Sequence, residues 1–341
     1  MARPAPTASP EEVQGRARGR APAVARVRSI LARQEVTLVI VMTLIIIAVS
    51  LRTPLFFTAS NLTQILEGAV IYFIVACGSA LLMIGGGLDF SVGAAFTFGG
   101  LLTAILLTAG IPVPLAVILG LAGSAAVGVV NWVVITWCHV PPIIATLGVF
   151  FGMVGITNQI TGGLDVVPLP TEFEWIAQSK ILGVPATIVI ATLVGVLTWF
   201  VLERTPLGTN VRALGGNRAA ALGNGLRVRR LDLFVYVAAA VTAGGAGLLY
   251  ASRVGSGQVA AGGSTLTLTV ITAVLIGGVS LLGGLGTIQG VAVGSVLLSL
   301  INNALVMSRI PPANNSLIIG GVLIAAVTFD YFRRQRLYRR R

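Results

Sequence analysis

The chain has 341 residues, of which 55% are hydrophobic and 10% are charged, and its mean hydropathy is +0.94. Soluble globular domains carry about 25% charged residues, so this composition excludes that class and indicates many membrane spans. The net charge of +12 does not indicate nucleic-acid binding. Seven arginines lie in residues 1–33, six in 204–230 and six in 333–341, and all three groups flank apolar runs, as the positive-inside rule predicts.

The first 35 residues are rich in Arg, Ala and Pro, with no apolar stretch before Ile30. They predict a disordered, basic cytoplasmic tail and no cleavable signal. Ten apolar runs follow, each near the ~20 residues that a bilayer requires. They cover 36–51, 62–84, 90–109, 112–137, 141–161, 182–202, 231–251, 265–282, 286–307 and 314–331, although 231–307 admits another partition.

An even number of spans, with the N-terminus inside, returns the C-terminus to the cytoplasm. The expected fold is therefore an all-α polytopic membrane protein with about ten transmembrane helices across 36–331 and a second basic tail at 332–341. On this map only Arg52, Lys180, Arg253 and Arg309 of the Lys and Arg residues face outward.

Two glycine clusters interrupt the apolar runs, at Gly85–Gly93 and Gly277–Gly286. Such sequences favour tight turns or broken helices, which are tolerated at membrane depth only where the backbone is buried or lines a wet cavity. We favour a turn and helix-packing role over direct contact with a transported molecule. The glycines assigned to turns are Gly85, Gly86, Gly87, Gly93, Gly277, Gly278 and Gly284.

The residues of a catalytic or metal site are missing. Lys180 is the only lysine and no phosphate-binding loop surrounds it, so ATP cannot bind in the P-loop manner. The single histidine, His139, has no Cys, Asp or Glu at ligand spacing, and Cys77 and Cys138 give no reason to expect a disulfide. We expect a non-enzyme that holds no metal and no cofactor.

The polar stretch 204–230 stands out in this apolar chain, because it is basic and punctuated by glycine. Such a segment cannot stay in lipid, and its arginines place it in the cytoplasm. It is expected to touch a partner; the alternative is an inert loop that only sets topology. Ion-driven carriers usually keep acids deep in their spans, whereas Glu67 and Asp89 can both be placed near an interface, so the driving energy is expected to enter through this loop.

Six segments then occur in an order typical of one family. They are Thr53-Pro-Leu-Phe-Phe-Thr-Ala-Ser-Asn-Leu62, Gly85-Gly-Gly-Leu-Asp-Phe-Ser-Val-Gly93, Val140-Pro-Pro-Ile-Ile-Ala-Thr-Leu-Gly148, Ile160-Thr-Gly-Gly163, Ala213-Leu-Gly-Gly-Asn-Arg-Ala-Ala220 with Gly225, and Gly277-Gly-Val-Ser-Leu-Leu-Gly-Gly-Leu-Gly-Thr-Ile-Gln-Gly290. From about Thr53 to Asp330 the chain resembles the membrane permease subunits of ABC importers for monosaccharides, of the ribose, xylose and arabinose type.

The resemblance implies a permease of the type II importer class in the bacterial cytoplasmic (inner) membrane. It implies four partners: a second permease subunit, either another copy or a paralogue, an ABC ATPase that binds ATP and Mg, an extracytoplasmic substrate-binding protein, and membrane lipid. The expected substrate is a sugar or related polyol.

The resemblance also implies that the ATPase docks on a short coupling helix within Gly215–Gly225. Local chemistry agrees, because Asn217 can cap a helix start, Arg218–Leu222 favours a helix, and Gly223 or Gly225 can end it. The residues assigned to coupling are Gly215, Gly216, Asn217, Arg218, Ala219, Ala220 and Gly225.

Sugar passage requires neutral hydrogen-bonding groups and aromatic faces. The candidates for the pathway are the polar or aromatic residues in or beside the spans, each of which could equally tie two helices together. They are Asp89, Ser91, Asn131, Trp132, Asn158, Gln159, Asn302 and Asn303.

One departure from the family concerns Thr267 and Thr269, which stand where a Glu-x-Asp pair is common, and which are expected at or near the outer membrane interface. The exchange is expected to alter binding-protein docking or substrate preference, or to mark a divergent branch. Two alternatives remain open: the same importer for a nucleoside, a branched-chain amino acid or a signalling furanosyl compound, and an ion-coupled secondary carrier.

Overall fold

The computed structural model describes residues 34–51 and 53–311 and isolated positions between 314 and 328. Residues 1–33 and the tail at 332–341 lie outside the described residues, and the expected span 314–331 is described only at those isolated positions. The elements are α3 (Gln34–Ser50), η2 (Pro54–Phe57), α4 (Ala59–Ile84), α5 (Val92–Thr108), α6 (Val113–Thr136), α7 (Pro142–Thr161), α8 (Thr171–Gln178), β1 (Lys180–Ile181), β2 (Val184–Pro185), α9 (Ala186–Arg204), α10 (Pro206–Gly216), α11 (Arg218–Gly223), α12 (Val228–Val254), α13 (Gly263–Ile276) and α14 (Ile288–Met307).

Among the described residues, six helices are long and apolar enough to cross a membrane: α4, α6, α7, α9, α12 and α14. Three shorter apolar helices, Leu38–Ser50 within α3, α5 and α13, coincide with three further expected spans. Apolar helices therefore occupy the first nine expected positions. The regularity follows from lipid, which cannot hydrogen-bond a backbone, so that spanning segments satisfy their own amides as helices.

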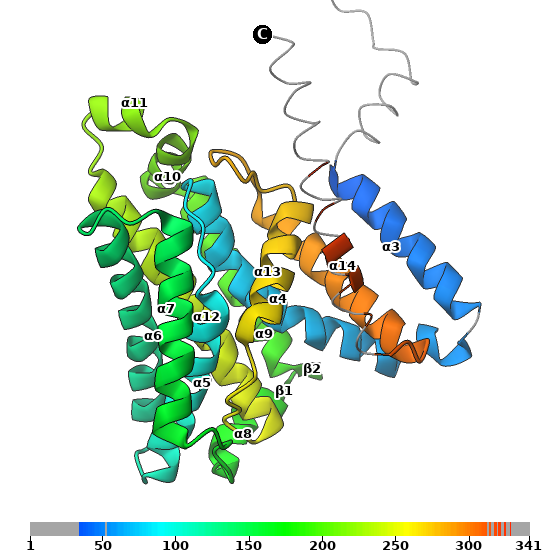
Figure 1. The fold of residues 1–341 in the computed structure, drawn as a ribbon. Coiled ribbons are helices and arrows are strands. Elements are labelled where there is room, and N and C mark those ends of the chain that lie inside the picture. Colours follow the sequence, from blue (N-terminus) through cyan, green and yellow to red (C-terminus); the bar gives the residue numbers. More distant parts are fainter. Residues whose placement is uncertain are drawn as a thin grey trace, which may run out of the picture.

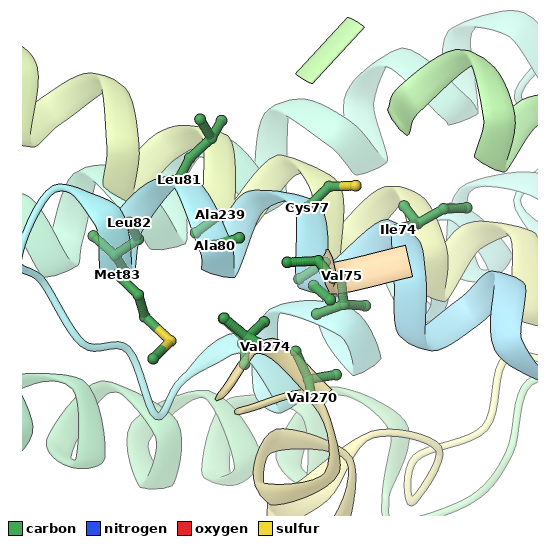
Figure 2. Packing of buried hydrophobic residues seen from close by; sticks show 14 of the residues in the cluster. Ile74, Val75, Cys77, Ala80, Leu81, Leu82, Met83, Ala239, Val270 and Val274 are labelled. Carbon is green, nitrogen blue, oxygen red and sulfur yellow. The ribbon is translucent and has the colours of Figure 1, made fainter. Parts of the chain in front are cut away.

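Helix α4 forms the centre of the bundle. It contacts α9, α12, α13 and α14, and 72% of its most apolar window is buried. Figure 2 shows Ala80 of α4 beside Ala239 of α12, with Val270 and Val274 of α13 on the other side of α4. Small residues at these contacts let the helix backbones approach closely, which is the main source of helix association in lipid.

Helices α6, α7 and α9 lie at the periphery. Only 28%, 22% and 33% of their most apolar windows are buried, against 56% for α12. Their outer faces are therefore available to lipid or to another membrane subunit.

The two ends of the bundle differ. Helices α10 and α11 lie at one end, and α8 lies at the opposite end together with the antiparallel hairpin β1–β2 (Figure 1). The hairpin, which pairs Ile181 with Val184, is a small exception to the expected all-α fold.

Three boundaries differ from expectation. Helix α12 begins at Val228, so Arg229 and Arg230 lie in its first turn and not in a loop. Helix α13 ends at Ile276, because the glycine-rich sequence that follows turns the chain away before the expected end at 282. The stretch before Asn217 is a helix, α10, which begins with Pro206 in its first turn and Thr205 as its cap.

Candidate functional site

The chain is broken between α4 and α5. Helix α4 ends at Ile84, Gly86 adopts a left-handed φ of 83°, and α5 begins only at Val92. The freed backbone amides find side-chain partners: Ser91 N donates to Asp89 Oδ1 at 2.6 Å, and Phe90 N donates to Thr146 Oγ1 of α7 at 3.1 Å. This confirms that the Gly85–Gly93 cluster interrupts the helical run, and it shows what stabilises the break.

Three of the expected pathway residues form one cluster at this break. Ser91 Oγ donates to Asp89 Oδ1 at 2.6 Å, and Asn131 Nδ2 of α6 donates to Ser91 Oγ at 2.7 Å and to Asp89 Oδ2 at 3.3 Å. All three are buried, with exposed fractions of 5% for Asp89, 1% for Ser91 and 0% for Asn131. Asn131 Oδ1 is buried and has no hydrogen-bond partner among the described residues. The cluster fixes the break against α6.

Three other candidates tie helices together. Trp132 Nε1 donates to Arg229 O at 2.9 Å, which joins α6 to the start of α12. Asn302 donates to the Tyr72 hydroxyl at 3.2 Å. Asn303 and Asn61 exchange amide hydrogen bonds of 2.9 and 3.1 Å, and both contacts join α14 to α4.

The last two candidates, Asn158 and Gln159, are exposed near the end of α7. Asn158 donates only to Val154 O within its own helix. The same helix carries Gly148, Gly152 and Gly155, around which a side chain would find open space. Helix α7 thus presents small and polar residues outward beside large apolar ones such as Ile144 and Phe151.

Thr267 and Thr269 lie in the first two turns of α13 and are buried inside the bundle, each with an exposed fraction of 2%. Thr267 Oγ1 accepts a hydrogen bond of 3.1 Å from Gly93 N in the first turn of α5, which has no side-chain cap of its own. Thr269 bonds only to Thr265 O, one turn earlier in α13. The broken helix α5 is therefore capped from α13, a contact between residues that are 174 positions apart.

A large apolar groove of about 540 Å³ lies among α4, α6, α9 and α12. Its two hydroxyl-bearing residues, Thr198 and Thr242, are bonded to carbonyls of their own helices. The groove therefore offers little to a polar solute, and its apolar lining suits lipid chains.

The expected coupling segment contains the helix that the sequence predicts. Asn217 Oδ1 accepts from Ala220 N at 3.0 Å and caps α11, which ends at Gly223, and Gly225 follows with a φ of 77°. Arg218, Ala219 and Ala220 are exposed on α11, whereas Gly215 and Gly216 belong to the end of α10.

Arg218 is held by a residue that is not among the expected site residues. Its Nη1 and Nη2 donate to Asp232 Oδ1 and Oδ2 of α12 at 3.0 and 2.6 Å, and Asp232 is 7% exposed. The hydrogen bonds to Asp232 raise the pKa of Arg218 above its ordinary value, and burial opposes them. The sequence did contain a signal for this pair, because Asp232 is an acid in the first turns of an apolar helix and follows Arg218 by 14 residues.

The end of α10 packs against two glycine-rich turns. A Cβ atom on Gly215 would lie 1.9 Å from Ile84 O and 2.7 Å from Gly284 N, and Gly284 N itself donates to Ile84 O at 2.8 Å. Gly284 has a left-handed φ of 76°, and a Cβ atom on it would lie 3.1 Å from Gly216 Cα. The end of α4, the turn between α13 and α14, and α10 therefore meet backbone to backbone, and we call this contact the glycine junction.

The sequence matches the family described as branched-chain amino acid transport system / permease component, over residues 61–327. The chain belongs to this permease family. Its relatives include the D-allose transport system permease protein AlsC of Escherichia coli strain K12, which is 32% identical over 289 residues (84% of this chain, 88% of the relative). The ribose import permease protein RbsC of Bacillus subtilis strain 168 is 33% identical over 289 residues (84% and 89%).

A third relative has a different cargo in its name. The autoinducer 2 import system permease protein LsrC of Escherichia coli strain K12 / DH10B is 32% identical over 303 residues (87% of this permease, 86% of the relative). No solved structure matches the permease. Family and spans together make the permease a multi-pass protein of the inner membrane.

At the α8 end, the permease has an ion pair that joins its two most buried long helices. Arg253 Nη2 of α12 donates to Glu67 Oε2 of α4 at 2.7 Å, and its Nη1 donates to Glu67 O at 3.3 Å. Glu67, one of the two acids that an ion-driven carrier could have used, is thus paired with a cation. Among the described residues, no group of three or more His, Cys, Asp or Glu could hold a metal ion.

Proposed function

We propose that this permease is the translocating subunit of an ABC importer for a monosaccharide or related polyol. The relatives with allose and ribose in their names support this class of substrate. A partner ABC ATPase binds ATP and Mg and supplies the energy, an extracytoplasmic binding protein delivers the sugar, and the permease itself performs no covalent chemistry.

The observation that carries the proposal is the attachment of α11. This exposed helix is capped by Asn217 and tied to α12 through Asp232, while the adjoining α10 is in backbone contact with Ile84 and Gly284. Docking of the ATPase on α11 therefore acts on α4, α12 and the turn before α14 together. Close backbone contact transmits a rigid-body shift, because no flexible side chain lies between the two segments to absorb the displacement.

We place the sugar pathway between the α7 helices of two permease subunits. Asn158 and Gln159 are exposed polar side chains in the last turn of α7, and a polar pathway or a facing subunit can hydrogen-bond to them. The glycines of the same helix permit close approach of a second helix. Thr146 near the start of α7 accepts the Phe90 amide, so the α4–α5 break is attached to the same helix and can move with it.

The first test is purification of the tagged chain from its native membrane with its associated proteins identified by mass spectrometry. We expect an ABC ATPase and a secreted or lipid-anchored binding protein. The binding protein is then screened against allose, ribose, arabinose and xylose by thermal shift. Uptake in proteoliposomes must require the binding protein, the ATPase and ATP.

The autoinducer 2 relative gives a specific reason to test a signalling furanosyl compound in the same screen, because its identity equals that of the allose relative. A melting shift with this compound and with none of the sugars would assign that cargo. Transport by the permease alone, driven by an ion gradient, would contradict the importer and establish the secondary carrier.

A further inference from the structure

A second pocket lies at the end of the bundle that carries α11. It encloses about 550 Å³ where α6 ends and α12 begins. Most of its lining side chains can carry positive charge, and Leu222 is one of the apolar residues among them. We call the site the basic pocket; its basic residues are His139, Arg218, Arg227, Arg229 and Arg230.

The charge of the basic pocket is not compensated within the described chain. Arg218 is neutralised by Asp232. The other three arginines, 227, 229 and 230, are exposed, and none forms an ion pair with a carboxylate of the described residues. Three like charges in one concave site repel one another, and a multivalent anion relieves that repulsion.

The surroundings of the pocket resemble the boundary between hydrocarbon and headgroups. Trp132 and Trp137 lie in and just after the last turns of α6, in edge contact at 6.4 Å between ring centres. Arg229 lies over the Trp137 ring at 5.8 Å, and Trp137 is 63% exposed. Tryptophan and arginine concentrate at this depth, because an aromatic ring rests against the hydrocarbon while a charged group reaches the headgroups.

We propose that the basic pocket binds the phosphate of an anionic phospholipid from the leaflet in which α6 ends and α12 begins. Phosphate is a strong partner for arginine clusters, and basic pockets between transmembrane helices are suited to acidic headgroups. The acyl chains have a surface to follow, since Val130 and Val133 are exposed in the last two turns of α6, the helix that supplies Ile135 and Thr136 to the pocket. A soluble phosphate compound shares the chemistry but gains nothing from that apolar surface.

The bound lipid would hold the start of α12 and, through the Arg218–Asp232 pair, α11. Lipid composition would thereby affect the stiffness of the coupling segment. This inference requires only that the chain spans a membrane, so it stands or falls independently of the transported solute.

The test uses the full-length chain purified in dodecyl maltoside and titrated separately with phosphatidylglycerol, phosphatidylcholine and inorganic phosphate. Native mass spectrometry counts bound lipid, and the melting temperature is measured in parallel. We expect phosphatidylglycerol to bind and to raise the melting temperature, and the other two probes to do neither at the same concentration.

The variants Arg227→Gln and Arg230→Gln should each weaken phosphatidylglycerol binding about fivefold, as for one basic side chain near a membrane surface. The matched control is Arg204→Gln, which removes the same charge from the end of α9, where the guanidinium lies over Trp199 and outside the pocket. It should leave the affinity unchanged. The lipid-free melting temperatures of all three variants establish that they are folded.

Equal binding of phosphatidylcholine, or an equal loss of affinity in Arg204→Gln, would overturn the proposal. An equal melting shift with inorganic phosphate would assign the pocket to a soluble anion. If Arg227→Gln binds lipid normally but no longer co-purifies the ATPase, the pocket belongs to the protein interface.

Discussion

Arg218 and Asp232 join α11 to α12 through two parallel hydrogen bonds of 3.0 and 2.6 Å. The geometry is that of a bidentate guanidinium–carboxylate pair, which lysine cannot reproduce. Asp232 is buried, whereas the Arg218 side chain is 58% exposed. The pair thus attaches an exposed helix, on which we place the ATPase, to a buried acid inside the bundle.

Substitution of Arg218 should therefore weaken both the fold and the coupling. Arg218→Gln leaves Asp232 without its cation, and we expect the free energy of unfolding to fall by about 1–2 kcal/mol. The loss should be smaller than for a fully buried pair, because the Arg218 side chain is 58% exposed to water. Melting in detergent and ATP-dependent uptake report the two effects. Arg218→Gln/Asp232→Asn should recover stability relative to Arg218→Gln, and equal stability of wild type and Arg218→Gln would contradict this role.

The glycine junction gives a second prediction with a neighbouring control. Gly215→Ala places a Cβ atom 1.9 Å from Ile84 O, so α10 must shift, whereas Gly216→Ala meets no atom within 4 Å. We expect Gly215→Ala to lower stability by about 1–3 kcal/mol, as overpacking does, and to reduce uptake strongly. Gly216→Ala should be close to wild type. Similar uptake by the two variants, at equal amounts in the membrane, would exclude transmission through the junction.

Thr267 should matter more than Thr269, although both are buried on α13. Thr267→Val removes the acceptor of the Gly93 amide, and an unsatisfied buried amide costs about 1–3 kcal/mol. Thr269→Val removes only a bond to its own helix and should cost less than about 1 kcal/mol. Melting temperatures of the two isosteric variants decide the question, and the reverse order would show that the α5 amide is capped differently.

The proposed pathway predicts a pattern of thiol accessibility. In a Cys138→Ala background, Asn158→Cys and Gln159→Cys should react with a charged, membrane-impermeant thiol reagent, because both positions are exposed on α7. Asn131→Cys should not react, since Asn131 is fully buried behind the break. Protection of the α7 thiols by substrate and binding protein would support the pathway, and labelling of Asn131→Cys alone would move it into the Asp89 cluster.

Much of the fold was predictable from local sequence. Long apolar runs must be helical in lipid, so hydropathy alone locates the nine apolar helices to within a few residues. The cap of α11 at Asn217 and its end before Gly225 were also predictable, because capping depends on neighbours within one turn. The break at Gly85–Gly93 could also be predicted from the sequence, because it depends on glycines that are close together in the chain.

The sequence alone therefore determined the apolar spans, the interruptions between them and the basic segment that leaves the membrane. Only the tertiary structure decided which polar residues meet. It joined Asp89 to Asn131, Thr267 to Gly93, Asn61 to Asn303 and Arg218 to Asp232. It also showed that Gly215 touches Ile84 and Gly284. The physical reason is that hydropathy specifies how each segment partitions into lipid, whereas contacts between helices depend on the rotation and depth of each helix, which every neighbouring helix sets together.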